Sequence, residues 1–114
     1  MVNLQWAVIE ANLNPVTGAE QKGIQLVLIV SNEEYNIAMP NVTILPLTTT
    51  QRRLYPSEVL LPERKAGQPL KSIVMAHQIR TISKQRLRKL FGNLDDAKLR
   101  MEINSAIKEH LDLD

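Results

Sequence analysis

Two places in the 114-residue chain carry side chains whose types and positions suit catalysis. The first is the segment 18–25, where Glu20 and Gln21 lie in a polar loop that runs into an apolar strand, with Gln25 at the junction. A loop held by a strand is a common position for functional side chains. The second is His77, whose imidazole can accept or donate a proton near neutral pH. The alternative for His77 is a structural histidine, partly buried near a strand bend and held by a hydrogen bond.

The charges of the chain are unevenly distributed. Residues 51–90 contain ten Lys and Arg against two Glu, a net charge of +8, whereas residues 1–50 and 91–114 each carry a net charge of −3. A basic block between acidic flanks favours a polyanionic or acidic partner at that block. The alternative is a solvated surface that happens to be basic. Arg52 and Arg53 are therefore candidates for phosphate contacts, or simply solvated charges.

The composition excludes several classes of site. The chain has no cysteine, which excludes disulfides, thiolate metal sites and a cysteine nucleophile, and which fits a reducing cytoplasm. The two histidines, His77 and His110, are too far apart in sequence to suggest a zinc site, so we expect neither a metal nor a cofactor. No apolar run approaches the roughly 20 residues that a membrane helix needs. We expect a cytoplasmic protein with one domain, residues 1–114.

The elements that position these groups are mostly short strands. Residues 24–31 are nearly all apolar, which predicts a central strand buried on both faces. Pro46 indicates that the strand containing it lies at an edge or carries a bulge. Other strands are predicted over residues 5–13, 42–48 and 57–61 and, through a bend, over residues 72–82.

Three helical segments are predicted between and after the strands. Asn32 is a plausible cap for one helical turn, and Ser83 is a possible cap for a short helix that Gly92 stops. Residues 95–111 have helical spacing and must bury an apolar stripe on the sheet or on a second subunit. That stripe consists of Leu99, Ile103, Ala106 and His110.

The fold class is therefore mainly β with flanking α. We expect five to seven short strands that close into a small barrel or curl into a half-open one, followed by an amphipathic C-terminal helix.

Three blocks of the sequence carry a resemblance to a known family. The blocks LNPVTGAEQKGIQLVLIVSN, VTILPLTT and SIVMAHQIRTISKQRL resemble the MazF/PemK family of toxin endoribonucleases, and the resemblance covers roughly residues 6–111. It implies a β-barrel of the CcdB/PemK type, a homodimer, and metal-independent cleavage of single-stranded RNA. It also implies neutralisation by a MazE-like antitoxin with an acidic, disordered tail. The +8 block agrees, because it suits either an RNA backbone or an acidic antitoxin segment.

The resemblance also assigns site residues. The loop pattern Gly-x-Glu-Gln is present at residues 18–21, and the hydroxyl that ends the third strand is Thr48, which can hydrogen-bond a phosphate. His77 stands where the family usually has an acidic residue. The resemblance implies catalytic roles for the position of Gln25 and for Thr48 and Glu20, and His77 is a further catalytic candidate because imidazole titrates near neutral pH. RNA contacts are expected for Gln21, Asn32, Arg52, Arg53, Gln78 and Arg80.

The main departure from the family is at Gln25, where the family has its catalytic arginine, and at Leu26, where it has proline. An arginine offers a permanent charge and a planar fork of donors, and an amide keeps two donors without the charge. Losing one such contact to a transition-state oxyanion costs about 3–4 kcal/mol, or roughly 100- to 1000-fold in rate. We therefore expect an attenuated enzyme. Gln25 is a natural loss, an attenuating change, or a tolerated variation in which other cations take over.

Two other functions remain open from the sequence. One is a catalytically inactive homologue that keeps the dimer and the antitoxin site and acts in regulation. The other is a gyrase poison of the CcdB type, which shares the fold. The C-terminal residues EHLDLD lack the Trp-Gly-Ile ending associated with such poisons, which argues against this second function.

Overall fold

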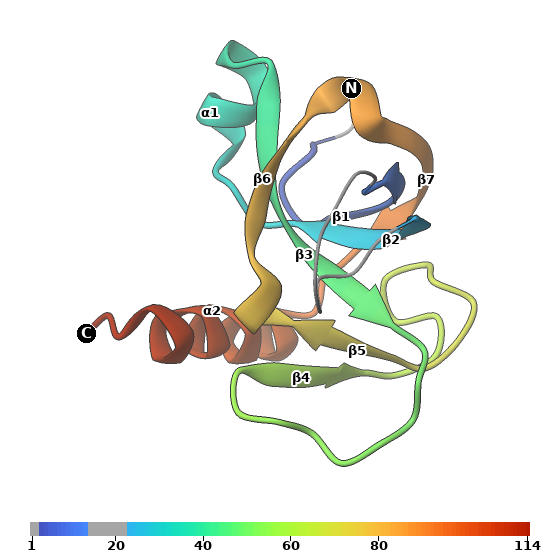
Figure 1. Ribbon diagram of the computed structural model, residues 1–114, viewed down its shortest axis with the longest axis vertical. Coiled ribbons are helices and arrows are strands. Elements are labelled where there is room, and N and C mark those ends of the chain that lie inside the picture. Colours follow the sequence, from blue (N-terminus) through green and yellow to red (C-terminus); the bar gives the residue numbers. More distant parts are fainter. Residues whose placement is uncertain (1–2, 14–22) are drawn as a thin grey trace.

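Short antiparallel strands form most of the structure, a computed structural model that describes residues 3–13 and 23–114. These residues form β1 (Ala7–Asn12), β2 (Ile24–Ile29), β3 (Asn41–Thr48), β4 (Glu58–Leu61), β5 (Ser72–Met75), β6 (Arg80–Ser83) and β7 (Leu87–Asn93). Their order in the sheet is β4-β5-β3-β2-β1-β7, and β6 also pairs with β3. The sheet curls without closing, with β4 and β7 at its two ends (Figure 1). The mainly β, half-open fold predicted from the sequence is confirmed.

The strand β3 is central, and the prediction of an edge position from Pro46 is wrong. On one side β3 pairs with β2, and on the other side it pairs first with β6 and then with β5. The register pairs with β6 end at Ile44, and those with β5 begin at Leu47. Pro46 lies in the interval between these two neighbours, where a missing N–H interrupts neither register.

The segment after Ser83 is a strand for most of its length, and the predicted helix there is wrong. Ser83 does accept a hydrogen bond from the Gln85 N–H, but it caps only the three-residue 3₁₀ turn η2 (Lys84–Arg86). The chain then continues as β7, which pairs with β1 through two register shifts. Gly92 does not stop a helix. It lies against another backbone, since a Cβ there would be 2.4 Å from the carbonyl oxygen of Ala66.

Two α-helices begin at side-chain caps, of which the cap at Asn32 was predicted. Asn32 caps α1 (Glu33–Ala38) by accepting from the Tyr35 N–H. Asp96 caps α2 (Ala97–Leu111) by accepting from the Leu99 N–H at 3.0 Å. The residues Leu99, Ile103 and Ala106 are buried against the sheet, whereas His110, which was predicted to lie on the same stripe, is exposed. Within the described part of the chain, no helix is long and apolar enough to cross a membrane.

Two apolar clusters hold the sheet, one on each face. Leu28 of β2 packs in the cluster that includes Leu99 and Ile103 of α2. Val27 and Ile29 pack in the cluster on the opposite face. Because alternate residues of a strand point to opposite faces, β2 is buried on both faces over residues 27–29, as its apolar composition predicted. This rigid strand carries Gln25 at its less buried beginning.

Candidate active site

Gln25 lies at the second position of β2 and is half-buried. Its Nε2 donates a hydrogen bond to the carbonyl oxygen of Leu47 at 3.1 Å. The register pairs of β2 with β3 begin at Val27, so the Gln25 side chain continues the contact between the two strands beyond their last register pair. The amide is therefore occupied by backbone at one of its donors.

Thr48 is the residue after Leu47 and ends β3. Its Oγ1 accepts from the Thr50 N–H at 3.2 Å, a local bond that leaves the hydroxyl hydrogen available to an acceptor. The strand pairing therefore brings the predicted residues Gln25 and Thr48 to one end of β2 and β3. Glu20 and Gln21, which were predicted to complete this site, lie outside the described residues.

A second polar cluster surrounds Glu58, which sequence reasoning missed. The side chain of Glu58 is fully buried. Arg52 donates to both of its carboxylate oxygens, at 2.7 and 2.8 Å, and the Tyr55 N–H donates at 2.7 Å. The Nε2 of His77 lies 2.7 Å from the Oε2 of Glu58. We name Arg52, Tyr55, Glu58 and His77 the Glu58 cluster.

The hydrogen bonds set the ionisation of Glu58. Burial by itself would raise the pKa of the carboxyl, but the bonds from Arg52, His77 and the Tyr55 N–H outweigh burial and lower the pKa to about 2. The hydrogen bonds that Arg52 donates to Glu58 raise the pKa of Arg52 above its ordinary value. The carboxylate is thus a permanent anion at neutral pH, and Arg52 is held in one orientation. Glu58 is one of two acids in the basic block and directly precedes the apolar residues 59–61, which was the signal that could have found it.

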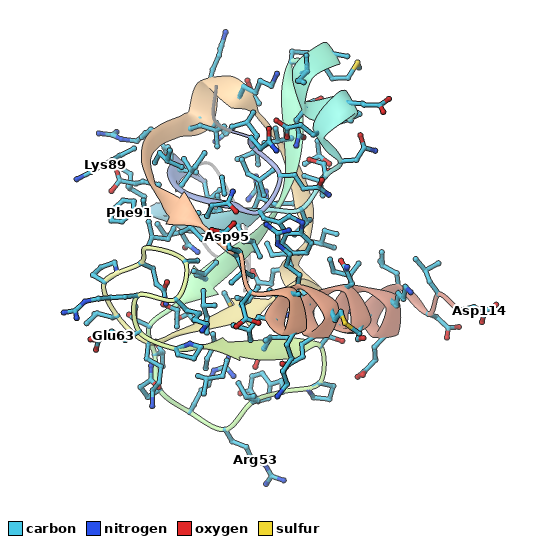
Figure 2. All side chains as sticks on the ribbon, turned by 180° about the vertical axis from the view of Figure 1, so that it is seen from behind. Arg53, Glu63, Lys89, Phe91, Asp95 and Asp114 are labelled. Atoms are coloured by element: carbon cyan, nitrogen blue, oxygen red, sulfur yellow. The ribbon has the colours of Figure 1, made fainter. Side chains whose placement is uncertain are left out.

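The two predicted arginines of the loop between β3 and β4 behave differently. Arg52 is committed to Glu58, and its guanidinium carbon lies 4.2 Å from the centre of the Tyr55 ring. Arg53 is exposed, and its side chain points away from the body of the protein (Figure 2). Arg53 is the one of the pair that can reach a phosphate without giving up an internal bond.

Sheet register separates the two groups. Thr48 is opposite Ile73 of β5, whereas Glu58 is opposite Met75, two residues farther along. Two residues span roughly 7 Å along a strand, and the two strand spacings from β3 to β4 add roughly 10 Å across the sheet. The Glu58 cluster, including His77, is therefore near the Gln25–Thr48 pair, but the two groups do not converge on one site.

The remaining predicted RNA contacts are dispersed. Asn32 caps α1 near the beginning of β3, at the opposite end from Thr48. Gln78 lies half-buried in the 3₁₀ turn η1 (Ala76–Gln78). Arg80 begins β6, and its Nη1 is buried without a hydrogen-bond acceptor among the described residues. A buried N–H group without an acceptor is costly, and an atom with no exposed surface cannot meet a phosphate in this conformation.

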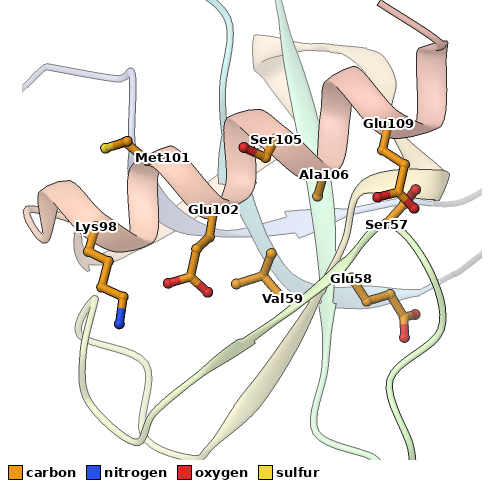
Figure 3. A pocket seen from close by; sticks show the side chains of 9 residues that line it. All are labelled: Ser57, Glu58, Val59, Lys98, Met101, Glu102, Ser105, Ala106 and Glu109. Carbon is orange, nitrogen blue, oxygen red and sulfur yellow. The ribbon is translucent and has the colours of Figure 1, made fainter.

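Two adjoining hollows lie beside the Glu58 cluster. One, of about 420 Å³, runs between β4 and α2, where Lys98, Glu102 and Glu109 point from the helix toward β4 (Figure 3). The other, of about 760 Å³, is bounded by residues 53–58 and by Glu109. Both share Ser57, Glu58 and Glu109, so they adjoin along the edge of the sheet.

Known proteins resemble the chain along most of its length. Residues 4–111 match the family described as PemK-like, MazF-like toxin of type II toxin–antitoxin system. The endoribonuclease MazF of Staphylococcus saprophyticus is 35% identical over 104 residues, which cover 90% of this chain and 86% of the relative. The endoribonuclease EndoA of Bacillus subtilis is 36% identical over 75% of each chain.

The fold is shared as well. A mycobacterial endoribonuclease, solved in complex with its cognate antitoxin, superposes with a TM-score of 0.80 and 30% identity, covering 99% of this chain and 98% of that one. The chain therefore belongs to the MazF-like toxins of type II toxin–antitoxin systems, a family of endoribonucleases, as its sequence blocks indicated.

Proposed function

We propose that this chain is the toxin of a type II toxin–antitoxin pair and cleaves single-stranded RNA slowly, without a metal. The observation that supports this is the pairing of Gln25 with Leu47 beside Thr48. The position that the family gives to a catalytic arginine is placed next to the strand-end hydroxyl, yet it carries an amide that is bonded to backbone.

The proposed reaction uses the 2′-hydroxyl of the RNA as the nucleophile. The 2′-oxygen forms a bond to phosphorus, the bond to the 5′-oxygen breaks, and the products are a 2′,3′-cyclic phosphate and a 5′-hydroxyl. One group must take the 2′ proton, and one must protonate the leaving oxygen. We assign Thr48 and Gln25 to the phosphate oxygens and Glu20 to proton transfer. His77 remains a candidate for proton transfer, although sheet register separates it from the Gln25–Thr48 pair.

The rate of RNA cleavage is limited by the absence of a positive charge at position 25. As phosphorus gains a fifth oxygen, negative charge grows on the phosphate, and fixed donors aimed at that charge lower the barrier. Gln25 offers one free N–H and no positive charge, because its other donor is directed at Leu47. We therefore propose a rate about 100- to 1000-fold below that of an arginine-bearing site.

The partners follow from the same family. We propose a cytoplasmic homodimer, and exposed apolar side chains on and beyond α2, at Met101, Leu111 and Leu113, support association of this helix with another surface. We also propose a MazE-like antitoxin whose acidic, extended tail covers part of the basic surface. The solved relative in complex with its cognate antitoxin supports such a pair.

The test is the double change Gln25→Arg, Leu26→Pro. Leu26 is in register with Glu10 of β1 but lies outside the register pairs of β2 with β3, so proline there breaks none of the β2–β3 pairs. The double variant should cleave single-stranded RNA at least 100 times faster than the native chain, leaving cyclic phosphate ends, and 2′-deoxy substitution at the cut site should abolish cleavage. Gln85→Arg, which adds the same charge at an exposed amide of η2, is the control and should not raise the rate.

Absence of any gain in cleavage would refute the role given to Gln25. If the double variant stays inactive while the native chain binds an acidic antitoxin peptide in a pull-down, the chain is a non-catalytic homologue that sequesters the antitoxin.

A further inference from the structure

Tyr55 is an exposed aromatic ring held in a fixed orientation. The residue is 58% exposed, yet its backbone N–H is bonded to buried Glu58 at 2.7 Å. The Arg52 guanidinium covers the ring at 4.2 Å from its centre and is itself held by two bonds to Glu58. A buried carboxylate therefore holds the backbone of Tyr55 and the cation that covers its ring, which lowers the entropic cost of binding on the ring.

The surroundings of Tyr55 have the chemistry of a single-strand binding site. Tyr55 lines the depression of about 760 Å³ together with Arg53 and Glu109. Proteins bind unpaired nucleic acid by stacking bases on aromatic rings next to basic side chains that hold the backbone. Arg53, exposed and pointing outward (Figure 2), supplies such a charge.

Glu109 adds selectivity. Its carboxylate points from α2 toward Ser57 at the border of the depression (Figure 3). A carboxylate accepts hydrogen bonds and donates none when ionised, so it favours bases that carry an exocyclic amino group. Adenine, cytosine and guanine carry such a group, whereas uracil has a single ring N–H flanked by two carbonyl oxygens that a carboxylate repels.

We propose that Tyr55, Arg53 and Glu109 form a subsite for one unpaired nucleobase of the RNA strand, and that the subsite prefers a base with an exocyclic amino group. This proposal rests on RNA being the substrate. The loop from Thr48 to Glu58 joins the two groups of polar residues, so the base bound on Tyr55 belongs to a nucleotide that flanks the reacting phosphate. Tyr55 is thus a specificity-determining residue that takes no part in the chemical step.

The experiment measures binding of 2′-O-methyl oligomers, which cannot supply the nucleophile. Homo-oligomers of A, C and U and an abasic oligomer of equal length are titrated onto the native protein and onto Tyr55→Ala, Tyr55→Phe, Tyr35→Ala and Glu109→Gln. The native protein should bind oligo(A) and oligo(C) about 5- to 150-fold more tightly than the abasic oligomer, and oligo(U) less tightly than either. Tyr55→Ala should remove most of that difference, whereas Tyr55→Phe should keep it.

The other variants separate the contributions. Tyr35, whose hydroxyl is bonded to Asn41, is the matched control, and its loss should leave the preference for bases unchanged. Glu109→Gln should bring oligo(U) close to oligo(A), because an amide can also donate to uracil carbonyls. Titration with free AMP, CMP and UMP shows whether the subsite binds a base without its strand, and the strand should bind more tightly because Arg53 adds a phosphate contact.

The outcomes also distinguish this proposal from the proposed function. If all oligomers bind but Tyr55→Ala leaves the ratio of base-bearing to abasic affinity unchanged, the subsite is wrong and RNA binding stands. If no oligomer binds to the native chain and the Gln25→Arg, Leu26→Pro variant cleaves no RNA, both proposals fall.

Discussion

The Gln25–Thr48 pair and the Glu58 cluster differ in how their polar groups are satisfied. Gln25 and Thr48 are each half-buried, and among the described residues each side chain holds one hydrogen bond. The carboxylate of Glu58 is fully buried and is bonded to Arg52, Tyr55 and His77. Buried, saturated polar groups stabilise one conformation, whereas groups with spare donors can bind a substrate. This difference supports the proposal that the Gln25–Thr48 pair takes part in cleavage and that the Glu58 cluster holds a binding surface in place.

The largest expected effect is on stability, at Glu58. Glu58→Ala leaves Arg52, the Tyr55 N–H and His77 without their shared acceptor, and losing hydrogen bonds to a charged group costs about 1.5–3 kcal/mol. Urea unfolding should show this loss in the free energy of unfolding. Glu102→Ala, at an exposed position of α2, is the matched control and should change it by less than about 0.5 kcal/mol. Equal stabilities of the two variants would contradict the structural role of the cluster.

The next effect is on rate, at Thr48. In the Gln25→Arg, Leu26→Pro background, Thr48→Ala should lower the rate of RNA cleavage about 100-fold, because one donor to the phosphate is lost. Its free energy of unfolding should change by about 1 kcal/mol at most, since only the local bond to Thr50 disappears. A large loss of stability with unchanged cleavage would reverse the roles of the two regions.

A third effect separates the regions by pH. The pKa of Glu58 is about 2 in the folded chain, against an ordinary value of 4.5. Between these values the unfolded chain binds a proton that the folded chain does not, so stability falls as the pH decreases through this range. The melting temperature of the native chain should therefore drop more steeply below about pH 4.5 than that of Glu58→Gln. Parallel curves would show that Glu58 is not the group responsible.

The smallest effect concerns His77. His77→Gln keeps a donor toward Glu58 and should cost about 1 kcal/mol of stability. In the Gln25→Arg, Leu26→Pro background we expect the rate of cleavage to fall less than tenfold, because sheet register separates His77 from the Gln25–Thr48 pair. A fall of 100-fold or more, with loss of one limb of the pH–rate profile, would make His77 a general acid or base. The two regions would then be one site.

Most of the fold was predictable from local patterns. The apolar run of β2, the cap at Asn32 and the stripe of Leu99, Ile103 and Ala106 each depend on short-range spacing, and each is confirmed. The failures involve distant segments. Residues 87–93 became a strand because β1 pairs with them, and Gly92 meets the backbone of Ala66, which lies 26 positions earlier.

The candidate site was predictable to a similar extent. The sequence blocks identified the family and pointed to Gln25 and Thr48 as candidates. The register of β2 with β3 brings these two residues to the same end of the strands. The Glu58 cluster was missed because its members, Arg52, Glu58 and His77, have no periodic spacing. Their association depends on how β4 pairs with β5, which no local pattern encodes.

By itself, the sequence determined the family, the mainly β class, the basic block and the uncharged amide at position 25, because each of these depends on residue identity and local order. The tertiary structure alone decided that Gln25 donates to Leu47, that His77 binds a buried carboxylate, and that Tyr55 is held in place beneath Arg52. The physical reason is that hydrogen bonds and ring contacts act over a few ångströms. Only the folded backbone brings residues that are distant in sequence within that range.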